Sequence, residues 1–500
     1  MKITNNIKKN YIDTIGYLLI ILFSYAAFSK ILDYQTFTIQ LGQSPLLSAF
    51  AGWVAWFIPS VELLIAVLLM FRRTRLLALV TSFALMMMFS AYIYIILHYS
   101  EFVPCSCGGI LEKMTWNQHL IFNLIICLLA ILAIIFSFQE LQQQNKAWRL
   151  RYSLLFIFAI SIFAVGIVLV LFLKSEQIIH KENNFIRRYP PHLYNKSAQF
   201  NLKYDGYYFA GMANDTIYLG NFLSPLSVIA INSNLKIIGN YSIELDNYEL
   251  PYRTAQVRIS PPYFFLTDGT VPCIFKGKIR TWKAKQLQAV KTHFSVFEPI
   301  DSITAAIRSR NPKTNESILG LLTFSNGNTS VSWNDGLLQK QIDGVFDCDG
   351  MLRYNLKNQK LIYTYYYRNQ FIVADKTIKD FYRGNTIDTT TLAKIKIASL
   401  GNGVRKMAQP PLMVNKLSST VDNQLFINSN LRAHFESLKL WKQSSAIDVY
   451  NLKTKTYEYS FHVYNINNKK PQAMYATKDK VYFIFDKVLV AYQLDKSVRR

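Results

Sequence analysis

Two cysteines separated by one serine are the residues in this chain best suited to chemistry. Residues 105–109 read Cys-Ser-Cys-Gly-Gly and lie between two long apolar runs. A thiolate attacks a disulfide, and a second nearby thiol resolves the mixed disulfide that forms. Closing so small a ring needs a turn, which the two glycines permit. The position of Cys105 and Cys107, in a short loop between two apolar runs, favours thiol–disulfide exchange more than their spacing does. A structural or incidental pair, and half a metal site completed by His98 or His119, are the alternatives.

Five apolar runs must position this segment, and each is long enough to cross a hydrocarbon core of about 30 Å as a helix. We therefore expect a helical membrane region in the first third of the chain. The runs are 12–32, 47–71, 76–98, 118–138 and 151–174.

The basic residues at the ends of these runs predict the orientation. The 33–46 loop has no lysine or arginine, and the 99–117 loop has only Lys113. Because basic loops stay in the cytoplasm, we expect the N-terminus inside, and the cysteine loop and everything after Lys174 in the periplasm. This predicts a multi-pass protein of a bacterial inner membrane. The basic ends are formed by Lys2, Lys8, Lys9, Arg72, Arg73, Arg75, Lys146, Arg149 and Arg151.

The formal net charge of +24 bears on partners as well as on topology. With five apolar runs present, we assign the basic residues to orientation and to anionic lipid or acidic partners, and we expect no nucleic acid.

Polar residues inside the predicted spans are the second group of candidate site residues. Glu62 lies within the second span, and a carboxyl group in hydrocarbon usually faces the bundle interior beside a partner. Lys30, near the outer end of the first span, is the candidate partner, with snorkelling of its side chain as the alternative. Asp33 follows Lys30 by about one turn. Asn123 in the fourth span is suited to a hydrogen bond between helices.

After the spans, short segments rich in Tyr, Phe, Ile and Val alternate with Asn, Gly, Asp and Lys turns. A strand-turn phrase recurs at 228–236, 352–357 and 446–453, each with an asparagine at the turn. Repeats spaced by ~40 residues favour a β-propeller of six to eight blades, with a pair of β-sandwiches as the alternative. In this region Cys273 and Cys348 are either a disulfide or two buried thiols.

The order of these motifs resembles the methylamine-utilisation protein MauE family, within the DoxX-like membrane proteins. The similar stretches are Phe-Ser-Lys-Ile-Leu-Asp at 28–33, Pro-Ser-Val-Glu at 59–62, the Cys-x-Cys loop, and a polar residue at Asn123. The resemblance covers about residues 10–140. It implies a four-helix bundle with a periplasmic redox loop, in a family implicated in maturing methylamine dehydrogenase, a disulfide-rich periplasmic enzyme.

Two departures from the family affect what the resemblance implies. The family loop usually reads Cys-Gly-Cys followed by Phe-Gly or a similar pair, whereas Ser106 and Gly108 stand here. The family is also normally a short protein, and the added C-terminal region suggests a partner other than the methylamine enzyme.

The sequence thus predicts an α-helical membrane bundle followed by an all-β extracytoplasmic domain. We expect a four-helix domain at 1–140, a cytoplasmic loop and fifth span at 141–176, a linker at 177–200 and a periplasmic propeller-like domain at 201–500.

The leading functional hypothesis is thiol–disulfide exchange by Cys105 and Cys107 with a periplasmic thiol protein or client enzyme that the β-domain recruits. Lys30, Asp33, Glu62 and Asn123 would support the bundle, and a membrane quinone is the candidate electron acceptor. One alternative is a non-enzymatic, membrane-anchored receptor or assembly factor with a structural cysteine pair. Another is a transporter or metal-handling protein.

Overall fold

The protein is described from a computed structural model, in which the chain forms two compact units. One unit comprises Met1–Lys181 with Ile395–Pro411, and the other comprises Glu182–Lys394 with Leu412–Arg500. The described residues are 2–34, 37–38, 41, 47, 50–99, 114–141, 146–179, 183–191, 193–287, 292–325, 328–399 and 405–495.

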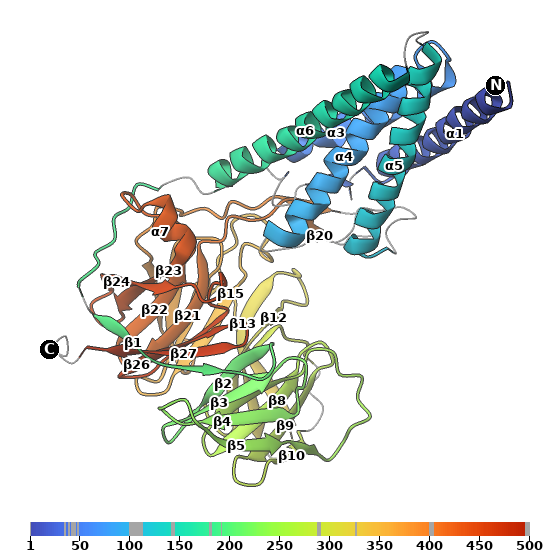
Figure 1. Ribbon diagram of the computed structural model, residues 1–500. Helices are drawn as coiled ribbons and strands as arrows, with labels where there is room; N and C mark the ends of the chain where they lie inside the picture. The colour runs from blue at the N-terminus through green and yellow to red at the C-terminus, as the bar shows by residue number, and fades with distance from the viewer. Residues whose placement is uncertain are drawn as a thin grey trace. The chain divides into compact units, whose positions relative to one another are not determined.

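The first unit is built on five helices that are long and apolar enough to cross a membrane. Their sequences carry few charged residues over stretches of 19 to 27 residues, so each can satisfy its backbone hydrogen bonds internally while presenting apolar side chains to lipid. This confirms the predicted helical membrane region. The helices are α1 (Lys2–Leu32), α3 (Ala51–Met70), α4 (Arg75–Tyr99), α5 (Trp116–Leu141) and α6 (Lys146–Ile179) (Figure 1).

Within this unit α1 packs chiefly against α3, and α4 packs chiefly against α5. Helix α6 lies along α4 and α5. Only 17% of its most apolar stretch is buried, against 28–44% for the corresponding stretches of the other four helices. Much of α6 is therefore available to lipid, and the first four helices form the packed core.

The second unit is a six-bladed β-propeller, and Figure 1 labels many of its strands. Each blade is an antiparallel sheet, apart from a short parallel pairing at the edge of the second blade. The innermost strand of each blade contacts that of the next around a closed ring. Six blades fall within the predicted range, and the β-sandwich alternative is wrong.

The strands group by blade as follows. Blade 1 has β2 (Tyr207–Ala213), β3 (Thr216–Asn221), β4 (Ser227–Ile231) and β5 (Ile237–Ser242); blade 2 has β6 (Glu244–Leu245), β7 (Gln256–Ser260), β8 (Tyr263–Asp268), β9 (Cys273–Lys278) and β10 (Lys283–Gln286); blade 3 has β11 (Val296–Pro299), β12 (Thr304–Arg310), β13 (Ser317–Ser325) and β14 (Asn328–Asn334). Blade 4 has β15 (Gly350–Asn355), β16 (Lys360–Tyr365), β17 (Gln370–Asp375) and β18 (Phe381–Asn385); blade 5 has β21 (Asn415–Val421), β22 (Gln424–Ser429), β23 (Ser444–Asn451) and β24 (Thr456–Tyr464); blade 6 has β25 (Ala473–Ala476), β26 (Lys480–Phe485), β27 (Val488–Leu494) and β1 (Tyr194–Asn201).

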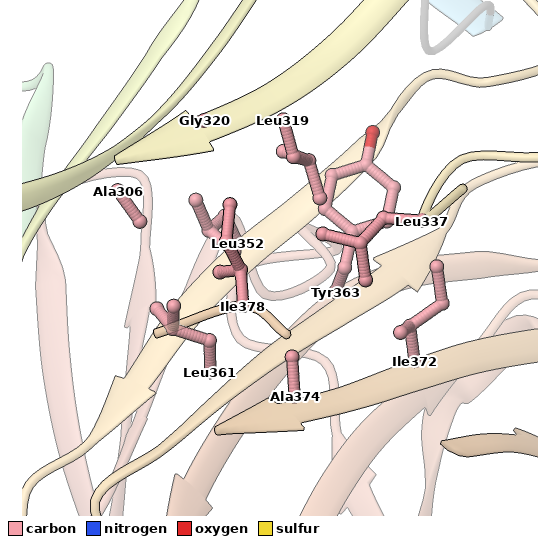
Figure 2. A pocket seen from close by; sticks show the side chains of 10 residues that line it. All are labelled: Ala306, Leu319, Gly320, Leu337, Leu352, Leu361, Tyr363, Ile372, Ala374 and Ile378. Atoms are coloured by element: carbon pink, nitrogen blue, oxygen red, sulfur yellow. The ribbon is translucent and has the colours of Figure 1, made fainter. Parts of the chain in front are cut away.

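The seam between each pair of neighbouring blades is filled by its own cluster of buried apolar side chains. Successive residues of a strand face opposite sides of the sheet, so Phe264 packs toward blade 1 and Phe265 toward blade 3. This two-sided burial explains the continuous apolar runs of the middle strands. Figure 2 shows the seam between blades 3 and 4, where a cavity of only about 10 Å³ remains.

The ring is closed by pairing the two ends of the propeller sequence. Strand β1 runs antiparallel to β27, from Tyr194 opposite Leu494 to Asn201 opposite Val488. Residues 177–200, expected as a linker, thus include the last residues of α6 and most of β1.

Two further elements lie outside the blades. The hairpin β19 (Ile397–Ser399) and β20 (Arg405–Met407) interrupts the sequence between blades 4 and 5. The short helix α7 (Leu438–Gln443) precedes β23, and the Ser437 hydroxyl caps it by accepting the Leu440 N–H.

Candidate functional site

Lys30 and Glu62 form an ion pair inside the helical unit. Lys30 lies in the last turn of α1, and Glu62 lies 11 residues after Ala51 at the start of α3. The Lys30 Nζ donates to Glu62 Oε1 at 2.5 Å, and the two side chains are 16% and 1% exposed. The contact between α1 and α3 therefore brings together the two polar groups that the sequence singled out.

Aromatic rings complete the surroundings of the Lys30 ammonium. The Nζ lies 5.8 Å from the centroid of the Phe37 ring and 5.9 Å from that of Phe89. Ring faces attract a cation, most strongly where water is excluded. The ammonium is thus held by a carboxylate and two aromatic rings, which argues against simple snorkelling.

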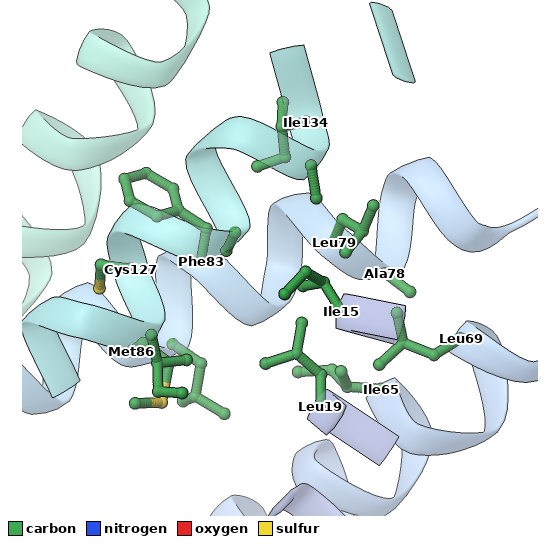
Figure 3. Close-up of a cluster of buried hydrophobic side chains, with 14 of the residues drawn as sticks. Ile15, Leu19, Ile65, Leu69, Ala78, Leu79, Phe83, Met86, Cys127 and Ile134 are labelled. Carbon is green, nitrogen blue, oxygen red and sulfur yellow. The ribbon is translucent and has the colours of Figure 1, made fainter. Parts of the chain in front are cut away.

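The apolar core of the bundle shares the helices that carry this pair. Figure 3 shows side chains of α1, α3, α4 and α5 that interdigitate, among them Leu19, Ile65, Phe83 and Ile134. Such packing fixes the helix register and with it the distance between Lys30 and Glu62.

The second carboxylate oxygen of Glu62 is not engaged by Lys30. Glu62 Oε2 is buried and has no hydrogen-bond partner among the residues that the structure describes. An unpartnered carboxylate oxygen in a membrane interior is costly and marks a candidate functional site. Beside an ammonium, it can accept a further hydrogen bond or a proton.

A second ion pair joins Arg75, at the start of α4, to Asp13 in the first half of α1. Its side chains are 16% and 27% exposed, so it lies nearer the surface of the unit than Glu62. Asp13 and Lys30 are 17 residues apart on one helix, which corresponds to about 25 Å at a rise of 1.5 Å per residue. The two pairs therefore bracket most of a hydrocarbon thickness of about 30 Å.

The other two predicted intramembrane residues differ in burial. Asp33 is exposed just beyond α1, where its carbonyl accepts the Phe37 N–H at 3.0 Å. Asn123 is 6% exposed on α5, seven residues after Trp116. Asn123 is therefore buried, as a hydrogen bond between helices would require, whereas Asp33 lies at the surface.

Cys105 and Cys107 lie outside the described residues, in the segment that connects α4 to α5. The remaining three cysteines, Cys127, Cys273 and Cys348, are buried and free. The two propeller cysteines are therefore buried thiols, the second of the alternatives considered for them. Cys348 donates its thiol hydrogen to the Gln339 carbonyl at 3.4 Å.

A buried charge cluster in the propeller escaped the sequence analysis. Arg187 donates to Asp448 at 2.7 Å and to Glu436 at 2.9 Å, and its side chain is 1% exposed. Its partners lie 249 and 261 residues away in the sequence. A charged residue stands out in a sequence when its neighbours are apolar. Arg187 does not, because it lies in a polar stretch and is followed by a second arginine.

The described part of the propeller has a surface pocket of about 310 Å³ beside the turn between β26 and β27, in addition to the small cavity of Figure 2. The residues described include no group of three or more His, Cys, Asp or Glu side chains that could hold a metal ion. The apolar cavity of Figure 2 is about the size of one water molecule. Its walls are Ala306, Leu319, Gly320, Leu337, Leu352, Leu361, Tyr363, Ile372, Ala374 and Ile378.

Comparison with known proteins finds a family match for a segment of the helical region. Residues 8–136 match the family described as methylamine utilisation protein MauE, which confirms the resemblance carried by the motifs. The matched segment contains Lys30, Glu62, Cys105 and Cys107. No curated protein matches the sequence.

Several solved structures are similar to the propeller-sized part of the chain. A protein of unknown function from Bacteroides thetaiotaomicron is 8% identical, with a TM-score of 0.37, covering 60% of this chain and 72% of its own. U3-55K is 6% identical, with a TM-score of 0.37 and coverages of 59% and 98%. The Myceliophteria thermophila Cps50 (Swd1) β-propeller domain is 6% identical, with a TM-score of 0.33 and coverages of 60% and 100%.

Proposed function

We propose that this multi-pass membrane protein, a MauE-type helical region joined to a six-bladed propeller, exchanges disulfides with a periplasmic thiol protein through Cys105 and Cys107. The observation that carries the proposal is the family match over residues 8–136, which includes both cysteines and the buried Lys30–Glu62 pair. The propeller would recruit the client.

The proposed orientation follows from the charges at the helix ends. Three arginines, Arg72, Arg73 and Arg75, lie at the connection of α3 to α4. The connection of α4 to α5, residues 100–115, has Lys113 as its single basic residue. Under the positive-inside rule, the α3–α4 connection is cytoplasmic, and the cysteine loop and propeller are periplasmic. The membrane would then be a bacterial inner membrane.

The proposed reaction conserves atoms and electrons. A client thiolate attacks the Cys105–Cys107 disulfide, forming a mixed disulfide and releasing one cysteine as a thiolate. The client's second thiolate attacks the mixed disulfide, so the client leaves oxidised and both loop cysteines are reduced. Two electrons and two protons then pass to an oxidised acceptor, for which we propose a membrane quinone.

Glu62 is the proposed proton carrier for that second half-reaction. Its buried Oε2 has no partner among the described residues, and Lys30 contacts the other oxygen. A carboxylate so placed can take up a proton while the adjacent ammonium limits the cost of its charge. Lys30 acts here as a positioning residue.

The proposal is tested by trapping the redox state of the loop in intact cells. Thiols are alkylated with a mass tag before and after mild reductant, in the wild-type chain and in Cys105→Ser and Cys107→Ser variants. We expect a mixture of oxidised and reduced loops in the wild type, and a trapped mixed disulfide with the client in one single-cysteine variant. Cys127→Ser is the matched control and should leave the pattern unchanged.

The opposite outcome favours the membrane-anchored receptor or assembly factor. A pair that is fully oxidised, resists mild reductant and traps no partner would be a structural disulfide. The function would then rest on binding by the propeller.

A further inference from the structure

The propeller has an exposed apolar and basic surface next to the point where the chain enters it. We name it the Phe435 patch and define it as Ile186, Phe435, Leu438, Lys439 and Lys442. Its three apolar side chains are 61%, 80% and 41% exposed, and both lysines are exposed. An apolar group so exposed, with lysines at its edge, is typical of a surface that meets a partner.

Backbone pairing makes these residues neighbours. The His434 N–H donates to the Phe185 carbonyl at 2.8 Å, and the Asn183 N–H donates to the Arg432 carbonyl at 3.1 Å. The segment that contains Ile186 therefore runs beside the segment that contains Phe435. Leu438 and both lysines follow in α7.

Phe435 is held exposed against its backbone preference. Its φ is +67°, in the left-handed region that a bulky residue seldom adopts. The next residue, Glu436, is fixed by Arg187 at 2.9 and 3.0 Å and by the Ala433 N–H at 2.9 Å. Such strain persists only where the surroundings impose it, and it concentrates at functional sites.

The length of the chain keeps this patch close to the membrane. The candidate membrane span in α6 ends at Lys174, and the helix ends at Ile179. The five residues after Lys174 extend the helix by about 8 Å at 1.5 Å per residue. Four further residues reach Asn183, where the chain is bonded to Arg432, and they span at most about 14 Å. Asn183 can therefore lie at most about 22 Å from Lys174, whatever the path of the chain.

The charge of the patch suits a lipid surface. Helix α7 contains two lysines and no acidic residue, and Lys470 lies over the ring of the buried Trp441 at 5.8 Å. Lysines near an anionic leaflet each contribute about 1 kcal/mol of attraction, and aromatic and leucine side chains partition into the headgroup region.

We propose that the Phe435 patch docks on the anionic lipid headgroups of the membrane that the same chain spans, with Phe435 inserted among them. This docking would orient the propeller relative to the bilayer. The inference is independent of the redox chemistry proposed above.

Lysine footprinting of the full chain tests the docking without any substitution. The protein is reconstituted in vesicles of phosphatidylglycerol and phosphatidylethanolamine, in phosphatidylcholine vesicles and in detergent, then acetylated briefly and analysed by mass spectrometry. Lys453 is the matched control: it is exposed on the same blade, beyond the far end of β23, whose eight residues span about 26 Å. We expect Lys439 and Lys442 to be protected at least threefold relative to Lys453 in the anionic vesicles alone.

A spin label gives an independent measurement of insertion. Phe435→Cys and, as control, Leu356→Cys, which is 69% exposed in the β15–β16 turn, are labelled in a chain whose native cysteines are replaced. We expect a water-soluble nickel complex to reach the label at 435 several-fold less than that at 356 in anionic vesicles, and Lys439→Glu with Lys442→Glu to abolish the difference. Equal access at both sites would overturn the proposal. Protection that persists in detergent would also overturn it, in favour of a protein partner or a second copy.

Discussion

The two units each bury a cluster of charges, but they satisfy them differently. In the propeller, Arg187 donates from Nε to Asp448, from Nη1 to Glu436 and from Nη2 to the Leu431 carbonyl. In the helical unit, Glu62 contacts Lys30 through one oxygen, and its other oxygen has no partner among the described residues. We call the Arg187 cluster saturated, because its charged groups are paired, and the Lys30–Glu62 pair open, because one carboxylate oxygen is not. A saturated cluster fixes a structure, whereas an open one keeps the capacity to bind a ligand or to take up a proton.

The largest effect should follow from opening the saturated cluster. Arg187→Ala leaves Glu436 and Asp448 buried without their cation, which costs about 3–5 kcal/mol. We expect the propeller to unfold at a clearly lower urea concentration in detergent, as followed by tryptophan fluorescence, and the 183–191 segment to become sensitive to protease.

The neighbouring arginine provides the control for that change. Arg188 is exposed and contacts the Tyr457 ring and its carbonyl. Arg188→Ala should cost less than about 1 kcal/mol. Equal destabilisation by the two substitutions would show that the cluster around Arg187 has no special role.

The open cluster should respond differently to the loss of one partner and of both. Glu62→Gln or Lys30→Met alone leaves an uncompensated polar group in the membrane interior and should cost about 3 kcal/mol in SDS-induced unfolding. The double variant with Lys30→Met and Glu62→Leu should recover most of this stability, because an apolar pair needs no desolvation. If Glu62 carries protons, the double variant should still reoxidise the loop cysteines on the order of 100-fold more slowly.

The Arg75–Asp13 ion pair, in the first half of α1, separates these two roles. Asp13→Asn breaks the contact with Arg75, which is partly exposed, and should cost less than about 1 kcal/mol without slowing reoxidation. A double variant at Lys30 and Glu62 that reoxidises at the normal rate would reduce that pair to a structural one.

The same contrast sets how much could be predicted from sequence. The Lys30–Glu62 contact was foreseeable, since charged residues in apolar runs have few partners to choose from. Arg187 was not, because the propeller surface is rich in charge and its partners are brought near only by the closed ring of blades. Long-range pairing of this kind leaves no local pattern.

The propeller itself was predicted as a class, but its blades were not delimited. The recurring strand-turn phrase proves to mark hairpin turns at different places in the blades: it follows the third strand in blades 1 and 5 and the first strand in blade 4. In each, the asparagine at the turn accepts at least one backbone N–H group, as Asn232 does from Asn234 and Lys236, at 3.0 and 2.9 Å. The signal thus reflects turn chemistry, which any hairpin can use.

A smaller effect is expected at a saturated carboxylate in blade 2. Burial raises the pKa of Asp268. The hydrogen bonds from the N–H groups of Arg253, Thr254 and Thr270 lower that pKa by more than burial raises it, so it lies well below its usual range. A depressed folded-state pKa stabilises the protein above the unfolded-state pKa of about 4, and this stability is lost as the pH falls through the folded value. Asp268→Asn should cost about 1–3 kcal/mol at pH 7, and less as the pH approaches 2.

Urea unfolding at several pH values between 7 and 2 measures this dependence. The exposed Asp205 is the control, and Asp205→Asn should change the free energy of unfolding by less than about 0.5 kcal/mol. An Asp268→Asn cost that does not change with pH would mean that the aspartate charge is not what the turn requires.

The smallest effect concerns thiols that should not react at all. Burial raises the pKa of Cys273 to about 11 and that of Cys348 to about 12. Since the thiolate is the reactive form, their thiolate fractions at pH 8 fall roughly 100-fold and 1000-fold below that of a thiol with a pKa near 9, and burial also blocks the reagent. We expect N-ethylmaleimide to label neither residue in the folded chain and both after denaturation. Labelling of either in the folded chain would contradict the burial described here. If both stay silent, any rapid labelling that Cys105→Ser and Cys107→Ser together abolish belongs to the membrane loop, where the proposed chemistry requires it.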